Sequence, residues 1–190
     1  MPAIERITKA QLLEHLTLLD NEGRAWRFGY AASDSAIQMY VDGIADVDLI
    51  LGIRADIYSE VFAATIHLSF DIEKHSAEMG LSTLIDHRRK GFAERLMHYA
   101  IDVLRNRNIR ELYSVCLPDN QPLLKLLRKL NITSVVSNDG DKEARVNLPI
   151  AGLDSLVHEM QNRQLVVIDR TMKPWASIWK TMFLPKLPNN

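Results

Sequence analysis

The residues best suited to chemistry lie between positions 81 and 96, where a strand-like pattern passes directly into a helical one. Gly91 and Ala93 are small enough to let a ligand approach the backbone closely. The first N–H groups of a helix lack internal partners and carry the positive end of its dipole. The cations from Arg88 to Lys90 would add charge-assisted bonds to a pyrophosphate or a 3′-phosphate. These features predict a phosphate-binding loop, although an ordinary basic turn before a surface helix would have the same composition.

The glycine spacing separates this loop from two common nucleotide-binding loops. A Walker loop needs Gly-x-x-x-x-Gly-Lys-Ser/Thr, and a dinucleotide fingerprint needs three glycines in a parallel βαβ unit. The segment has neither pattern. The expected phosphorylated ligand is therefore not simply ATP or NAD.

Arg88-x-x-Gly91-x-Ala93 resembles the acetyl-CoA loop of the GNAT N-acetyltransferases, Gln/Arg-x-x-Gly-x-Gly/Ala. The segment from Asp119 to Ile132 resembles that family's second motif, an asparagine followed by a helix and a Lys-Leu-Gly-Phe-like ending. The resemblance covers roughly Thr8 to Pro149. It implies an acetyl-CoA-dependent enzyme that moves an acetyl group to an amine, of a small molecule or of a protein lysine or N-terminus, by direct attack.

The resemblance also implies which residues hold the cofactor. The backbone of the loop would bind the pyrophosphate, the end of the preceding strand would pair with pantetheine, and the motif asparagine would contact the cofactor arm. The residues assigned in this way are Leu84, Ile85, Arg88, Arg89, Lys90, Gly91, Phe92, Ala93 and Asn120.

Glu78 is the candidate general base. An amine with a pKa of about 10.4 is protonated at neutral pH and must lose a proton before it can attack a thioester. Glu78 stands ten residues before Arg88, where many members of the family that this chain resembles place a general-base glutamate. Backbone N–H groups around Leu81 to Thr83 would then stabilise the developing oxyanion. The alternative interpretation of Glu78 is an exposed carboxylate at a strand end.

The general acid of the family is missing. Many members have a tyrosine seven residues after the motif asparagine, and that position is Leu127 here. This departure leaves a second hypothesis open, a non-catalytic acyl-CoA-binding sensor or regulatory module. Candidate side chains for the acceptor pocket are Arg24, Trp26, Arg27, Tyr30, His67 and His75.

The pattern of elements predicts an α+β fold, with a mixed, mostly antiparallel sheet flanked by helices. Helices are expected over 8–19, 33–44, 92–104 and 120–130, the first opened by the capping-box sequence Thr8-x-x-Gln11. Strands are expected over 26–30, 49–53, 61–70, 78–85, 112–117, 132–136 and 145–148. These elements predict an acetyltransferase domain over residues 1–150.

Residues 151–190 are expected to form a C-terminal extension. It should contain a helix over 153–160, a strand-like segment over 165–168, and an amphipathic helix from Pro174 whose apolar face carries Trp175 and Trp179. That apolar face could pack on its own domain, form a homodimer contact or lie on a membrane surface.

Composition excludes several classes of protein. The 190 residues carry a formal net charge of -1, so no nucleic-acid partner is expected. No signal peptide or membrane-spanning run is visible, and the lone Cys116 suits a reducing compartment. A cytoplasmic location is therefore expected. The six histidines have no paired spacing, so no metal site is expected.

Overall fold

The fold is a 7-stranded sheet in the order β1-β2-β3-β4-β5-β7-β6. The computed structural model describes residues 2–56, 58–117, 120–130, 134–138 and 141–167. The strands are β1 (Ile4–Arg6), β2 (Leu49–Arg54), β3 (Phe62–Asp71), β4 (Ser76–Thr83), β5 (Glu111–Cys116), β6 (Ser134–Asn138) and β7 (Asp141–Asn147). Among these strands β4 and β5 run parallel, and the other neighbouring pairs run antiparallel. The predicted α+β class and mixed sheet are confirmed.

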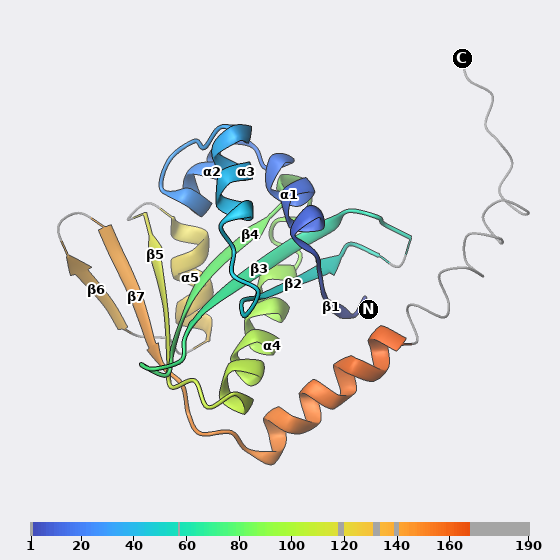
Figure 1. The fold of residues 1–190 in the computed structure, drawn as a ribbon, viewed down its shortest axis with the longest axis vertical. Helices are drawn as coiled ribbons and strands as arrows, with labels where there is room; N and C mark the ends of the chain where they lie inside the picture. The colour runs from blue at the N-terminus through green and yellow to red at the C-terminus, as the bar shows by residue number, and fades with distance from the viewer. Residues whose placement is uncertain (1, 57, 118–119, 131–133, 139–140, 168–190) are drawn as a thin grey trace, which may run out of the picture.

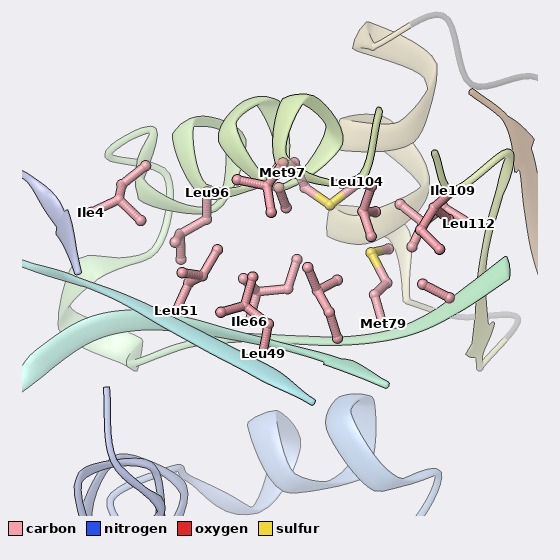
Figure 2. Packing of buried hydrophobic residues seen from close by; sticks show 14 of the residues in the cluster. Ile4, Leu49, Leu51, Ile66, Met79, Leu96, Met97, Leu104, Ile109 and Leu112 are labelled. Carbon is pink, nitrogen blue, oxygen red and sulfur yellow. The ribbon is translucent and has the colours of Figure 1, made fainter. Parts of the chain in front are cut away.

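Helices cover both faces of the sheet (Figure 1). They are α1 (Lys9–Thr17), α2 (Asn21–Phe28), α3 (Asp34–Asp42), α4 (Phe92–Asn106) and α5 (Gln121–Lys129), with a short 3-10 turn at Ile85–His87. Figure 2 shows α4 above the central strands and the amino-terminal helices on the opposite side. The sheet is therefore the middle layer of three.

Side-chain alternation along β2 assigns each residue to one of two cores. Leu49, Leu51 and Ile53 pack with Leu96 and the rest of the α4 layer. Ile50, between them, packs with α1 and α3 in the second core. Both faces of the strand are buried, which explains why its sequence is free of polar side chains from Leu49 to Ile53.

Three of the predicted helix starts are confirmed by their caps. Thr8 and Gln11 form the expected capping box, and Ser33 and Asn120 each accept a bond from a backbone N–H in the first turn of α3 and α5. A fourth cap, Asp20, accepts from Gly23 and starts α2.

Helix α2 overturns the prediction of a strand over residues 26–30. The alternation of large residues from Trp26 to Tyr30 suggested a strand, but residues 26–28 form the end of a helix that is capped by Gly29, with φ of 82°. The cap at Asp20 and a glycine in the left-handed conformation are both helix-boundary signals. The short edge strand β1 was not predicted, because three residues are too few to show a period.

Strands β4 and β5 separate after three residue pairs. Their register joins Ser76–Glu78 to Glu111–Tyr113, whereas β4 continues to Thr83. β3 pairs with β4 along its whole length. The second half of β4 thus has one edge that faces a gap rather than a strand.

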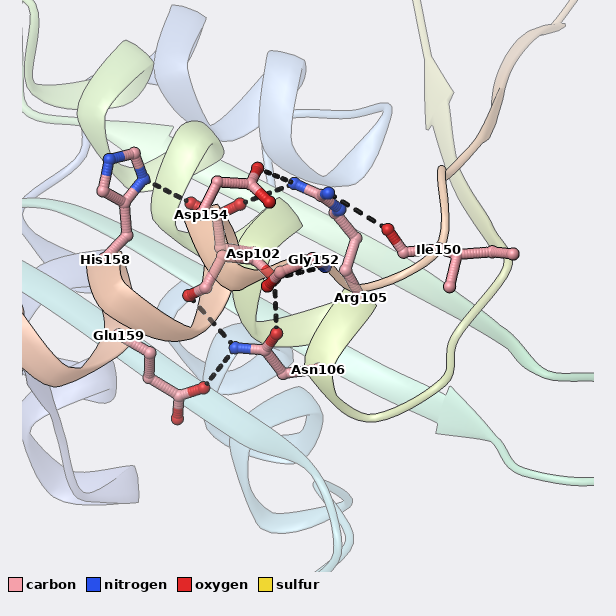
Figure 3. Close-up of polar contacts among 9 residues, drawn as sticks. Asp102, Arg105, Asn106, Ile150, Gly152, Asp154, His158 and Glu159 are labelled. Atoms are coloured by element: carbon pink, nitrogen blue, oxygen red, sulfur yellow. Dashed lines mark hydrogen bonds and ion pairs between the residues drawn. The ribbon is translucent and has the colours of Figure 1, made fainter.

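A further helix over residues 153–167 crosses the end of α4 (Figures 1 and 3). Arg105 bonds Asp102, Asp154 and the Ile150 carbonyl, and Asn106 bonds Glu159 at 2.8 Å. Farther along the helix, Asn162 bonds both backbone groups of Ile4 in edge strand β1, at 3.0 and 2.7 Å. These polar contacts attach the helix to the end of α4 and to the edge of the sheet.

The helix is longer than predicted. Residues 165–167 continue it, so the strand expected over 165–168 is wrong for the part that the structure describes. The amphipathic segment from Pro174 lies outside the described residues, and a homodimer contact there stays a prediction. No described helix combines the length and apolarity needed to span a bilayer.

Candidate functional site

A cleft of about 430 Å³ opens where β4 and β5 separate. Its walls come from the end of α2, the middle of β4, the end of β5 and the first turn of α5. The lining residues are Trp26, Arg27, Phe28, Gly29, Tyr30, Glu78, Met79, Gly80, Leu81, Ser114, Leu117 and Leu123. Three of the six candidate acceptor-pocket residues, Trp26, Arg27 and Tyr30, are among them.

The loop before α4 combines an unusual backbone with exposed cations. Its residues Arg89 and Gly91 have φ of 60° and 84°, the left-handed conformation. A Cβ at Gly91 would meet nothing within 4 Å, so the backbone there is open. Arg89 and Lys90 are exposed. Backbone and cations therefore meet at the start of a 15-residue helix.

Helix α4 begins without a side-chain cap, unlike the other four labelled α-helices. Its first-turn N–H groups are therefore free of side-chain acceptors within the described part of the chain. The acidic residue in that turn, Glu94, is paired with Lys129 at 2.8 Å, which reduces its repulsion of an anion. Both features suit a phosphate.

The side chain of Arg88 is directed at α2 and the residue that caps it. Its guanidinium bonds Asp20 at 2.5 Å and Glu22 at 2.7 Å, and lies 4.9 Å from the ring centre of Trp26. The side chain is therefore held by two carboxylates and an aromatic ring of α2. In this arrangement the side chain joins the loop to α2, and a contact of this guanidinium with a pyrophosphate stays a prediction.

Glu78 is exposed on β4 and lines the cleft. Its carboxylate makes no hydrogen bond or ion pair to the described residues. Two residues along the strand, on the same face, lies Gly80. A Cβ at Gly80 would overlap the guanidinium of Arg27, which thus lies directly on the backbone of β4. The cleft therefore presents one anion and one cation side by side on a strand.

The backbone of β4 also faces the gap. Leu84 N donates to Ala63 O at 3.0 Å, which fixes the phase of the ladder with β3. Because alternate residues direct their backbone groups to opposite edges of a strand, Leu81 and Thr83 face the gap that β5 leaves. These two are within the segment predicted to stabilise an oxyanion.

A chain of buried polar groups leads from the cleft into the fold. Arg27 donates to the Tyr40 hydroxyl, Tyr40 lies 2.6 Å from Nδ1 of His67, and Nε2 of His67 lies 3.1 Å from Oδ2 of Asp48. Burial lowers the pKa of His67, so the imidazole is neutral near pH 7. A neutral ring must donate from Nε2 to Asp48 and accept at Nδ1 from Tyr40. The hydroxyl hydrogen of Tyr40 and the Nε2 hydrogen of His67 then each have an acceptor.

The remaining predicted cofactor residues occupy varied positions. Leu84 directly follows β4, and Ile85 is the first residue of the 3-10 turn. Phe92 and Ala93 form the first turn of α4. Asn120 is buried and caps α5 by accepting from Leu123 N at 3.1 Å. Cofactor contacts by these residues stay predictions.

Other predicted residues have structural positions. Leu127 is 1% exposed and packs in the core beside α4. Arg24 pairs with Asp34 at 2.7 Å and bonds three backbone carbonyls, so it holds the α1–α2–α3 region together. His75 lies in the turn before β4, and His67 belongs to the buried chain; neither lines the cleft.

Sequence reasoning missed Tyr40, Asp48 and Gly80. Tyr40 falls on the apolar face of its helix and looked like core, and Asp48 precedes a strand like many turn residues. Gly80 offered the clearest signal, because a glycine inside a strand often marks a close approach of other atoms. Within the described residues, no group of three or more His, Cys, Asp or Glu side chains could hold a metal ion.

Comparisons with known proteins place this geometry in context. Residues 18–132 match the acetyltransferase (GNAT) family. The fold is similar to the GNAT domain of S. lividans PAT, with a TM-score of 0.63 and 19% identity over 76% of this chain and 89% of that one. It is also similar to an N-acetyltransferase from Staphylococcus aureus, with a TM-score of 0.62 and 14% identity over 78% and 99%.

A third similar structure is the PaiA N-acetyltransferase from Thermoplasma acidophilum in complex with coenzyme A. Its TM-score is 0.58, with 17% identity over 77% of this chain and 99% of that one. A search of curated protein sequences found no match. At these identities, the solved structures establish the shared fold.

Proposed function

We propose, from the premise that the chain belongs to the acetyltransferase (GNAT) family, that it transfers an acetyl group from acetyl-CoA to an amine bound in the cleft beside Glu78. The observation that carries the proposal is the meeting of two sites at one strand. The uncapped start of α4 follows β4 by a short loop, and the cleft with Glu78 opens along β4 itself.

The loop fits the phosphates of coenzyme A by its backbone. The open Gly91, the free N–H groups of the first helical turn and the exposed cations Arg89 and Lys90 are complementary to a pyrophosphate. The gap beside β4 fits an extended pantetheine arm, because Leu81 and Thr83 direct into it backbone groups that are not paired with any described strand. Asn120 begins the helix on the other side of this gap.

Acetyl-CoA would supply the thioester: the amine nitrogen bonds its carbonyl carbon, the carbon–sulfur bond breaks towards sulfur, and coenzyme A leaves as a thiol. Glu78 would first take a proton from the ammonium form of the acceptor, directly or through water. The Leu81 or Thr83 amide would donate to the carbonyl oxygen as negative charge develops there. With Leu127 in the core, the departing sulfur would obtain its proton from solvent or from the acceptor.

The first test is binding. Thermal unfolding should be measured with acetyl-CoA, coenzyme A, ATP and NAD in parallel, because a ligand at about a hundred times its Kd adds roughly 2.7 kcal/mol of stability. Stabilisation by the two CoA compounds alone is expected. Equal stabilisation by ATP or NAD, or none by any compound, would contradict the proposed cofactor site.

The second test is catalysis, measured as thiol release with a panel of amines. Replacing Glu78 by Gln should lower kcat by about 100-fold or more, the usual contribution of a general base. Glu73→Gln, an exposed carboxylate in the turn before β4, is the matched control and should retain activity. Binding of acetyl-CoA without turnover of any amine would instead support the acyl-CoA sensor, which the leucine at position 127 favours.

A further inference from the structure

The charge of Arg27 has no carboxylate partner among the residues that the structure describes. Arg24, Arg54 and Arg88 each pair with a carboxylate, but Arg27 forms no ion pair with any described residue. Its guanidinium is half-buried and lies 5.0 Å from the ring centre of Phe28 and 4.8 Å from that of Tyr40. Aromatic faces offset part of the cost of removing a cation from water, and an anion would offset the rest.

Gly80 makes the position of this cation possible. Any side chain at Gly80 would overlap the guanidinium of Arg27. Its backbone does not have the positive φ that demands glycine. Glycine weakens a strand interior, so its presence here is explained by the space that Arg27 occupies. The strand and the cation are therefore matched to each other.

Arg27 and Glu78 are close enough for one small molecule to contact both side chains. Gly80 and Glu78 are two residues apart on one face of β4, about 7 Å along the strand. Both Arg27 and Glu78 line the same cleft, and they do not pair with each other. A ligand with an amine at one end and an anion at the other would satisfy both groups.

A buried chain fixes the direction of Arg27. Asp48 accepts from Ala45 N and Phe70 N as well as from His67, so it is held by backbone on two sides. His67 then accepts from Tyr40, which leaves the Tyr40 oxygen to accept from Arg27. One nitrogen of the guanidinium is thus engaged, and the opposite edge stays available to a planar anion.

We propose that the acceptor is a zwitterionic small molecule, a free amino acid, whose carboxylate binds Arg27 while its amine lies at Glu78. This inference rests on the proposed acetyltransferase function. Tyr40, His67 and Asp48 act as positioning residues, because they reach the ligand only through Arg27.

The experiment uses the full chain, acetyl-CoA and matched pairs of acceptors, each standard amino acid beside its carboxamide. Thiol release should occur with at least one amino acid, with kcat/KM at least about 10-fold above that of its amide, as expected for a charged hydrogen-bond pair. In Arg27→Gln the KM for the amino acid should rise about 10- to 100-fold, with the KM for acetyl-CoA unchanged. The KM of Arg27→Lys for the amino acid should be intermediate, because lysine keeps the positive charge and loses the paired N–H donors of the guanidinium.

Controls separate this inference from the function on which it rests. Arg110→Gln, an exposed arginine at the start of β5, should leave the preference for the carboxylate unchanged. CoA-dependent thermal stabilisation of each variant verifies folding. Equal kcat/KM for amino acids and amides, or equal losses with both in Arg27→Gln, would overturn the inference while leaving the acetyltransferase intact. Failure of the unaltered protein to bind CoA would overturn the proposed function itself.

Discussion

Arg88 of the loop before α4 donates to Asp20, the residue that caps α2, over 2.5 Å. The cap also accepts from Gly23 N at 3.1 Å, so one carboxylate starts the helix and holds the loop. Helix α2 carries Arg27 and the aromatic wall of the cleft. The proposed phosphate loop and the proposed acceptor wall are therefore joined through Arg88, which pairs with both Asp20 and Glu22.

Gly23 provides a test of this joint. Alanine in place of glycine inside a helix normally adds about 1 kcal/mol of stability. Here a Cβ would lie 2.7 Å from Oδ1 of Asp20 and 2.8 Å from Nη2 of Arg88. Gly23→Ala should therefore lower the free energy of unfolding by about 1 to 2 kcal/mol, because it displaces the pair. Urea unfolding of the purified variant measures this change.

The double variant with Arg88→Ala is the control for that mechanism. Once Arg88 is absent, Asp20 can move and the alanine should cost much less, so the two losses should not add. Additive losses would show that the ion pair is not what the new methyl group disturbs.

Gly91 should be needed for cofactor binding more than for folding. It has φ of 84° and open space around it, so Gly91→Ala should cost about 1 kcal/mol of stability for the left-handed backbone alone. The methyl group would project from the loop where a pyrophosphate is expected. We therefore expect the KM for acetyl-CoA to rise about 10-fold, the effect of 1.4 kcal/mol.

Gly29→Ala is a closely matched comparison. Gly29 has φ of 82° and equally open surroundings, and it lies at the end of α2, where it lines the acceptor cleft and is not part of the loop before α4. The two variants should lose similar stability in thermal unfolding, and only Gly91→Ala should lose affinity for coenzyme A by calorimetry. An equal loss of affinity in both would contradict the assignment of the loop.

Local signals explain most of what could be predicted from the sequence. The caps at Thr8, Ser33 and Asn120 each depend on residues within one helical turn, and so does the glycine at the start of α4. Helix α2 had equally local signals in Asp20 and Gly29. The alternation of Trp26 and Phe28 was given more weight, although two aromatic residues at i and i+2 also occur on helices.

The relationships that shape the cleft could not be predicted in this way. Tyr40 and His67 are 27 residues apart, and their bond exists only because α3 packs on β3. Arg27 reaches Gly80 across a still longer interval of chain. Each of these residues also has an ordinary role that its sequence context suggests first. The start of α4 at Gly91 was therefore predictable from local sequence, whereas the cleft wall that carries Arg27 required the three-dimensional arrangement.

His15 should make the fold sensitive to moderate acid. It is completely buried, with Nδ1 2.7 Å from Phe62 O and Nε2 2.9 Å from Ser82 Oγ. The carbonyl can only accept, so Nδ1 carries the proton and Nε2 accepts from the serine hydroxyl. Burial lowers the pKa of His15 from 6.5 to about 4. The ring is neutral in the folded protein, and protonation would break the bond from Ser82.

The direction of the pH effect follows from this lowered pKa. Between pH 6.5 and 4 the unfolded chain binds a proton at His15 and the folded chain does not, so stability falls as pH falls through this range. A shift of this size corresponds to about 3 kcal/mol, and His67 shifts in the same direction because it too is buried. Urea unfolding at pH 7.5, 6 and 5 should show the loss.

His15→Gln isolates the contribution of this residue. The amide can donate to Phe62 O and accept from Ser82, and it does not titrate, so the variant should lose some stability at pH 7.5 from imperfect packing. Its stability should then depend less on pH between 6.5 and 4 than that of the unaltered protein. If the free energy of unfolding depends on pH with the same slope in both proteins, His15 is not the group that titrates. The assignment of a lowered pKa to His15 would then be wrong.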